Sequence, residues 1–187
     1  MKVFQKPIVA VAGSSGKTTT KEMIASILRT RWSIYKSKGN QNNRKALRKH
    51  AKRIRPYHRA VVLEFGMSGS GHLRRSCKII QPNLAVITMV GSAHIGNFGG
   101  SLNRLIKAKS QLAQNMKKNG TLFLNADDRN SRKLRLKPFH GTVKTVGLKG
   151  TGNYIANSIR YADGGMSFQA QVRGTDQQFF IPVYGIH

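Results

Sequence analysis

The sequence predicts an α/β fold, in which a mostly parallel sheet is flanked by helices and followed by a small antiparallel β appendage near the C-terminus. Short apolar runs alternate with segments of helical periodicity along the chain. A glycine-rich turn joins the first apolar run to the first helix, as in nucleotide-binding α/β domains. From residue 140 onward, alternating apolar and polar residues replace the helical segments.

The strands of the parallel part are expected at short apolar runs that glycine, proline or polar residues bound. These runs are residues 8–12, 32–35, 59–65, 84–89 and 121–124. Further along, the segments MSFQAQVR and QQFFIPV alternate in polarity around Gly174-Thr175-Asp176, which predicts an antiparallel hairpin.

Helices are expected between these strands, over residues 17–30, 43–55, 71–80 and 101–118. Ser101 is expected to cap the last of them and Asn119-Gly120 to end it. The inward side chains are expected to be Met23, Ile24, Ile27 and Leu28 in the first helix, and Leu47, Ala51 and Ile54 in the second.

The charge balance is strongly basic, with 33 Lys and Arg against six Asp and Glu and a net charge of +27. Such a field attracts polyanions, although a solvated basic surface gives the same composition. No apolar stretch approaches the ~20 residues of a membrane helix. The run at 8–12 is shorter than the core of a secretory signal, roughly 7–15 residues. A single cysteine, Cys77, fits a reducing compartment, so we expect a cytoplasmic protein without a membrane span.

The strongest local signal is the segment Gly13-Ser14-Ser15-Gly16-Lys17-Thr18 between the first strand and the first helix. Such a turn lets backbone N–H groups and the helix N-terminus converge on phosphate oxygens. Lys17 would reach the β- and γ-phosphates of ATP, and the Thr18 hydroxyl would hold Mg²⁺. Val11 stands where the general pattern has a further glycine, and an ordinary strand–helix turn is the alternative.

Five motifs follow one another in the order typical of one family: VAVAGSSGKTTTKEM, GNQNN, VVLEFGMSGSG, AVITMVGSAHIGNFGG and NADD. On these motifs, residues 8–187 resemble the central ATP-binding domain of the Mur ligase family. The resemblance is greatest to the type that adds D-alanyl-D-alanine to a UDP-muramoyl-tripeptide. Residues 1–187 are therefore expected to form one such domain, with the β appendage over 140–187 and without the family's flanking substrate domains.

The resemblance implies an ATP-dependent acid–amino-acid ligase of peptidoglycan synthesis. ATP would phosphorylate a carboxylate, and an amine would attack the acyl phosphate. The carboxylate would belong to a UDP-muramoyl-peptide and the amine to an amino acid or dipeptide, if the flanking domains exist. Family match gives Lys17, His94 and Lys109 catalytic roles. It also gives a nucleotide site of Gly13, Ser14, Ser15, Gly16, Lys17, Thr18, Thr19, Asn125 and Asp127, and metal ligands Thr18, Glu64, His94 and Lys109.

Glu64 and Lys109 also draw attention by their surroundings. A carboxylate at the end of a buried strand costs several kcal/mol unless it is paired or binds metal, so Glu64 needs a cation, a helix end or Mg²⁺. Lys109 falls within the apolar stripe of its helix, where burial would favour the neutral amine. A neutral amine can take up CO₂ as a carbamate. The family carbamylates the matching lysine, which would support a second Mg²⁺. Snorkelling of Lys109 is the alternative.

Three departures from the family pattern leave the substrates open: His72 and Gln111 stand where acids are usual, and the basic run RKALRKHAKRIR follows Asn43. Two other functions therefore stay as alternatives. One is a P-loop domain that binds nucleic acid or another polyanion, and the other is a non-catalytic relic that binds ATP.

Overall fold

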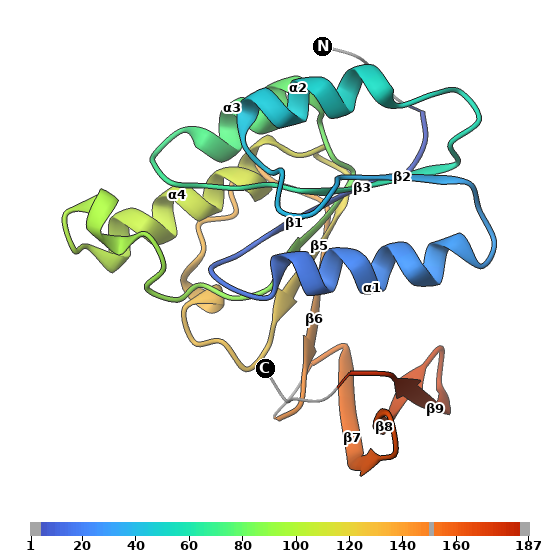
Figure 1. Cartoon of the computed structure of the whole chain (residues 1–187). Coiled ribbons are helices and arrows are strands. Elements are labelled where there is room, and N and C mark those ends of the chain that lie inside the picture. Colours follow the sequence, from blue (N-terminus) through green and yellow to red (C-terminus); the bar gives the residue numbers. More distant parts are fainter. Residues whose placement is uncertain (1–4, 150–151, 184–187) are drawn as a thin grey trace.

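The computed structural model describes residues 5–149 and 152–183. Within these residues, one sheet has the strand order β2-β3-β1-β4-β5-β6-β7-β8-β9. Figure 1 shows the parallel strands among the helices, with β7–β9 set apart from them. The strands are β1 (Ile8–Ala12), β2 (Ile34–Lys36), β3 (Ala60–Glu64), β4 (Leu84–Ile87), β5 (Thr121–Asn125), β6 (Thr142–Gly147), β7 (Tyr154–Ala162), β8 (Gly165–Val172) and β9 (Thr175–Ile181).

Neighbouring strands from β2 to β7 pair in parallel, and β7, β8 and β9 pair antiparallel, which confirms the predicted α/β class. The central strands β1 and β3 are buried along their whole length, as continuous apolar runs require. The helices are α1 (Lys17–Arg29), α2 (Arg44–Arg53), α3 (His72–Ile79) and α4 (Leu102–Asn115). The larger apolar core lies under α2, α3 and α4, and a smaller one lies under α1 on the opposite face (Figure 1).

Two helices begin at side-chain caps that satisfy otherwise unpaired N–H groups. The Asn43 side chain accepts a hydrogen bond from Ala46 N at the start of α2, and the Ser101 side chain accepts one from Arg104 N at the start of α4. The α2 residues Leu47 and Ala51 are buried, as expected from their spacing. The two caps fix the residues at which α2 and α4 begin, and the buried side chains hold α2 on the core.

Three sequence expectations need correction. Helix α4 ends at Asn115 instead of 118, because Met116 is extended and Lys117 N donates to Pro82 O. The side chain of Ile27 is 70% exposed, because α1 turns Lys21 and Ala25 toward the sheet instead. The second strand begins at Ile34 and excludes Trp32, which is 42% exposed.

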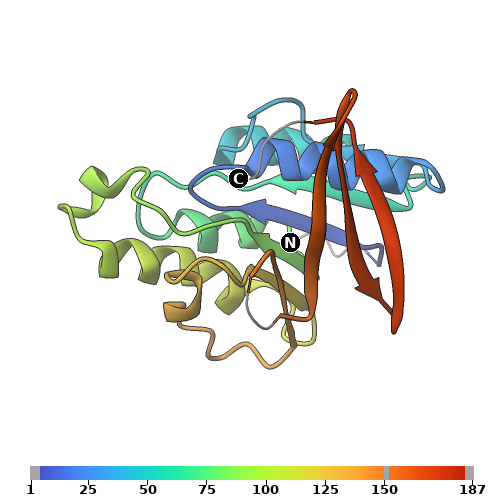
Figure 2. The ribbon, with the colours of Figure 1, turned by 90° about the horizontal axis from the view of Figure 1, so that it is seen from below.

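The β appendage is larger than expected. The predicted hairpin is confirmed as β8 and β9, but β6 and β7 were not predicted. Figure 2 shows β7–β9 side by side in front of the parallel part of the sheet. The ends of the chain, including residues 184–187 of the predicted appendage, lie outside the described residues. No helix in the described part of the chain has the length and apolarity to cross a membrane.

Candidate functional site

Most of the predicted site residues lie at or just after the carboxyl ends of β1, β3, β4 and β5, and Lys109 lies on α4. Strand β1 has β3 on one side and β4 on the other, so the chain crosses over β1 between these strands. In open α/β sheets, ligands bind at such a switch point, outside the carboxyl ends of the strands. The topology therefore places the glycine-rich turn after β1 at the usual binding position.

The glycine-rich turn needs glycine at both ends. Gly13 has φ +148°, and a Cβ there would lie 2.0 Å from Thr88 Oγ1. Gly16 has φ 73° and precedes the first residue of α1. No side chain caps α1, and its first turn holds no acidic residue. The first-turn N–H groups are therefore left for an anion from outside the chain.

Hydrogen bonds hold this turn against the segment that follows β4. Ser14 N donates to Met89 O over 2.9 Å. The Ser14 hydroxyl donates to Gly91 O and accepts from Gly91 N, both over 2.9 Å. Lys17 Nζ donates to Ser14 O over 3.3 Å, so the lysine lies over its own loop. The loop is thus fixed before any phosphate binds.

Glu64 at the end of β3 is 1% exposed and is held by neutral donors. The Thr18 hydroxyl donates to Oε2 and Asn42 Nδ2 donates to Oε1, each over 2.7 Å. Both ion pairs recorded for the described residues involve Glu22, so no Lys or Arg of this part of the chain pairs with Glu64. A buried carboxylate without a cation fits a metal ligand better than the lysine-paired alternative.

Asn42, which donates to Glu64, lies in the loop of residues 39–43. Hydrogen-bond donors from neighbouring elements hold three backbone carbonyls of this loop in place. Lys21 Nζ donates to Gly39 O over 2.6 Å, and Gly66 N donates to Asn42 O over 3.0 Å. His50 Nε2 lies 3.0 Å from Gln41 O. Sequence reasoning missed these supports. Lys21 could have been found by helical spacing, because it lies four residues before the buried Ala25.

His50 should make the stability of this region depend on pH. Because Gln41 O can only accept, His50 is protonated at Nε2, and its Nδ1 accepts from Tyr35 OH over 2.7 Å. Burial lowers the pKa of His50 in the folded state. Its stabilising effect is therefore complete above the unfolded pKa of about 6.5 and is lost as pH falls through the folded value. Urea unfolding of wild type and His50→Gln should show a smaller acid-side loss in the variant.

The control for this prediction is His140→Gln, which changes an exposed histidine. That variant should keep the acid-side loss of the wild type. An unchanged acid-side loss in His50→Gln would contradict the assignment.

Lys109 on α4 is 3% exposed, so its predicted burial is confirmed and the snorkelling alternative is wrong. Burial, helped by the positive charge of Lys17 and opposed by Asp128, lowers its pKa to about 8. Gln111 Oε1, two residues further on, is a buried oxygen for which the described residues provide no partner. Because the pKa of Lys109 is lowered this far, a sizeable fraction of its amine is neutral at mildly alkaline pH.

The turn after β5 is tied to both neighbouring segments. Asn125 Oδ1 accepts from Asp127 N over 2.9 Å, and the Asp127 carboxylate accepts from Leu148 N and Lys149 N over 2.6 and 3.0 Å. Asp127 therefore has a structural role, and its nucleotide contact stays a prediction. Asp128 Oδ2, which sequence reasoning missed, accepts from Val90 N over 2.6 Å. Asn130 Nδ2 donates to Val90 O over 2.9 Å.

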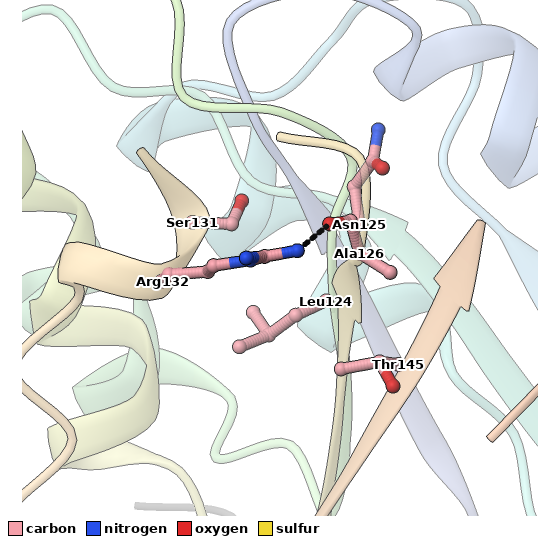
Figure 3. Close-up of a pocket in the computed structure, with 6 residues that line it drawn as sticks. All are labelled: Leu124, Asn125, Ala126, Ser131, Arg132 and Thr145. Carbon is pink, nitrogen blue, oxygen red and sulfur yellow. Dashed lines mark hydrogen bonds between the residues drawn. The ribbon is translucent and has the colours of Figure 1, made fainter. Parts of the chain in front are cut away.

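Beside this turn lies a cavity of about 270 Å³, drawn in Figure 3. Arg132 crosses it and donates from Nη2 to Ala126 O over 3.0 Å, the dashed line of Figure 3. Asn125, predicted to contact the nucleotide, forms part of the wall. The lining residues are Leu124, Asn125, Ala126, Ser131, Arg132 and Thr145.

His94 is less tightly integrated than the other predicted ligands. It is exposed, has φ 66° and precedes the 3₁₀ helix η1 (Ile95–Phe98). Across residues 5–149 and 152–183, no three His, Cys, Asp or Glu side chains lie close enough to hold a metal ion together. Mg²⁺ commonly keeps waters and takes phosphate oxygens alongside one or two carboxylates, so Glu64 needs no such cluster. The metal role of His94 stays a prediction.

Sequence comparisons show which proteins this chain resembles. The family model of the Mur ligase middle domain matches residues 11–187. A UDP-N-acetylmuramoyl-tripeptide–D-alanyl-D-alanine ligase of Bacillus subtilis is 31% identical over 180 residues, which are 96% of this chain and 38% of that protein. The corresponding ligase of Synechocystis is 35% identical over 147 residues, which are 79% of this chain and 32% of that protein.

Solved structures agree. A crystal structure of MurF from Acinetobacter baumannii superposes with a TM-score of 0.88 and 29% identity, covering 97% of this chain and 39% of that one. MurF from Thermotoga maritima in complex with ADP gives a TM-score of 0.83 and 29% identity, covering 95% of this chain and 40% of that one. The chain thus spans less than half the length of each of these relatives.

Proposed function

This chain belongs to the Mur ligase family, and from that premise we propose that it forms the ATP-binding core of an ATP-dependent carboxylate–amine ligase in peptidoglycan precursor synthesis. One observation carries the proposal. The uncapped N-terminus of α1 and the buried Glu64 carboxylate meet through the Thr18 hydroxyl, 2.7 Å from Glu64 Oε2. Thr18 therefore joins the expected phosphate-binding turn, which we call the phosphate cradle, to a buried carboxylate that has no cationic partner among the described residues. The ADP bound by the Thermotoga relative supports a nucleotide in this cradle.

The residues present fit Mg²⁺. Thr18 and Glu64 offer hard oxygen ligands, which Mg²⁺ prefers, and the Glu64 carboxylate lacks a cationic partner among the described residues. His94 and carbamylated Lys109 are the further ligands that we propose, the latter for a second ion. When bound, Mg²⁺ would offset the negative charge of the transferred phosphoryl group.

The residues of this chain would hold and orient ATP during the reaction. Lys17 and the first-turn N–H groups of α1 would bind the β- and γ-phosphates. Residues 13–19 would surround the phosphates of the nucleotide, and Asn125 and Asp127 would contact another part of it. A substrate carboxylate oxygen attacks the γ-phosphorus and ADP leaves. An amine then attacks the acyl carbon, loses a proton and expels phosphate, which leaves an amide.

The substrates are proposed by analogy with the named relatives, as a UDP-muramoyl-peptide carboxylate and an amino-acid or dipeptide amine. Residues 1–187 would act as one domain of such an enzyme. The continuous core beneath α2, α3 and α4, whose members lie between Ile8 and Phe139, supports a single folding unit for that part of the chain.

Calorimetric titration with ATP, with and without Mg²⁺, tests the proposal. We expect one ATP per chain and tighter binding with Mg²⁺. Absence of ATP binding in the presence of Mg²⁺ would refute the assignment. Binding without any turnover, in a form of the protein that also carries substrate domains, would instead favour the non-catalytic relic.

Carbamylation of Lys109 should be visible directly. With ¹³C-labelled bicarbonate near pH 8, where the lowered pKa leaves about half of the amine neutral, wild type should show a carbamate carbon by NMR. Lys109→Met should lose this signal, because methionine keeps the buried stem without the amine. Lys107→Met, which changes an exposed neighbour on α4, should retain it. A wild-type spectrum without the signal would contradict carbamylation.

A further inference from the structure

The outward face of α2 carries a dense set of cations to which the proposed ligase reaction assigns no role. Five residues of this helix line one shallow groove of about 530 Å³. All five are exposed, and the set is defined here as the α2 basic face: Arg44, Lys45, Arg48, Lys49 and Lys52. We propose that this face binds the phosphate backbone of a nucleic acid without reading its sequence, an activity beyond the proposed function.

The cations lie on a rigid support. Leu47 and Ala51 bury the opposite side of α2 in the core, and Asn43 caps its first turn. Residues four apart on a helix lie about 6 Å apart along its axis, so Arg44, Arg48 and Lys52 form one evenly spaced row. Along the axis of a duplex, each strand carries one negative charge per about 3.4 Å, so this spacing is close to two such axial rises. The row therefore presents positive charges at a spacing comparable with that of backbone phosphates.

The α2 basic face has no acidic neighbour to neutralise it. Helix α2 contains no acidic residue, and both ion pairs recorded for the described residues use Glu22 instead. Glu64 is buried, and Asp127 and Asp128 accept hydrogen bonds in the turn after β5. The remaining acids, Asp163 and Asp176, lie in the β7–β9 unit. With 33 basic and six acidic residues in the chain, little negative charge is left to repel a long polyanion.

The exposed chemistry favours nucleic acid over a membrane. A helix that binds at a membrane surface inserts apolar side chains, but the apolar residues of α2 pack into the core. Charge alone is sufficient for nonspecific nucleic-acid binding, because phosphate contacts release counterions. Tyr57, 66% exposed just beyond α2, offers one ring for stacking, so base recognition would be weak.

Fluorescence anisotropy with a labelled DNA duplex tests the proposal. Wild type should bind at low salt, with log K falling linearly as log salt rises. The triple variant Arg44→Gln, Arg48→Gln, Lys52→Gln should lower the affinity at least about tenfold and reduce the salt slope by about 2–3, for three lost contacts. Lys17→Ala should bind DNA as wild type does, which separates this activity from the nucleotide site.

The matched control removes the same charge from exposed lysines elsewhere, as Lys118→Gln, Lys133→Gln, Lys137→Gln. This control should keep the wild-type salt slope. Equal weakening by both triple variants, or no DNA binding at low salt, would overturn the proposal. So would binding to phosphatidylserine vesicles that needs the α2 basic face while DNA binding does not. If the triple variant unfolds by circular dichroism, Arg48→Gln alone should still reduce the slope by about 1.

Discussion

Lys17→Ala should weaken MgATP binding by at least about tenfold and leave the fold intact. Among residues 5–149 and 152–183, Lys17 Nζ hydrogen-bonds only to Ser14 O of its own loop, over a long 3.3 Å, so the fold depends little on it. Hydrogen bonds to a charged group contribute about 1.5–3 kcal/mol, which corresponds to roughly 10- to 100-fold in affinity. Calorimetric titration of wild type and variant measures the loss, and circular dichroism measures the fold.

Lys118→Ala is the matched control for Lys17→Ala, because it also removes an exposed lysine. Lys118 follows α4 close to Pro82, which precedes β4, so it lies at the opposite edge of the sheet from the glycine-rich turn. It should bind MgATP as wild type does. If Lys17→Ala and wild type bound MgATP equally, the glycine-rich turn would not be the phosphate site.

Glu64→Gln should abolish most of the strengthening that Mg²⁺ gives to ATP binding. Glutamine keeps the size of the side chain and can still accept one of the two hydrogen bonds, from Thr18 or Asn42. It removes the negative charge that would hold the cation, an interaction worth several kcal/mol. Without Mg²⁺, the free energy of unfolding should not fall, because the variant no longer buries an unpaired charge. ATP titrations across a range of Mg²⁺ concentrations, together with urea unfolding, measure both effects.

Asp163→Asn provides the comparison, because it neutralises an exposed acid in the β7–β9 unit. Its Mg²⁺ dependence should match that of wild type. Glu64→Gln with undiminished Mg²⁺ dependence would mean that another group holds the metal.

The sequence predicted well those elements whose side-chain pattern is decided by burial. Strands β1 and β3 are apolar along their length because both faces are covered, and α4 shows its stripe because one face packs on the sheet. Strands β6 and β7 were not predicted, because much of each is exposed and their sequences lack a regular alternation of apolar and polar residues. Strand β6 forms because its backbone pairs with β5, as Leu122 does with Val143, and β7 forms because it pairs with β8 across a tight turn.

The same distinction applies to the site. The glycine-rich turn was predictable because only glycine fits at Gly13, beside Thr88. The burial of Lys109 followed from helical spacing. The supports contributed by His50 and Asp128 were not predictable, because their partners, Gln41 O and Val90 N, are backbone atoms brought near by the fold.

The hydrogen bonds along the carboxyl edge of the sheet have a mechanical consequence. The Ser14 hydroxyl hydrogen-bonds to the backbone of Gly91, and the side chains of Asp128 and Asn130 hydrogen-bond to the backbone of the neighbouring Val90. The loop after β1 and the turn after β5 are therefore coupled through two adjacent residues. Local opening at either end should spread to the other, so amide hydrogen exchange at Ser14, Val90 and Gly91 should slow together when a nucleotide binds.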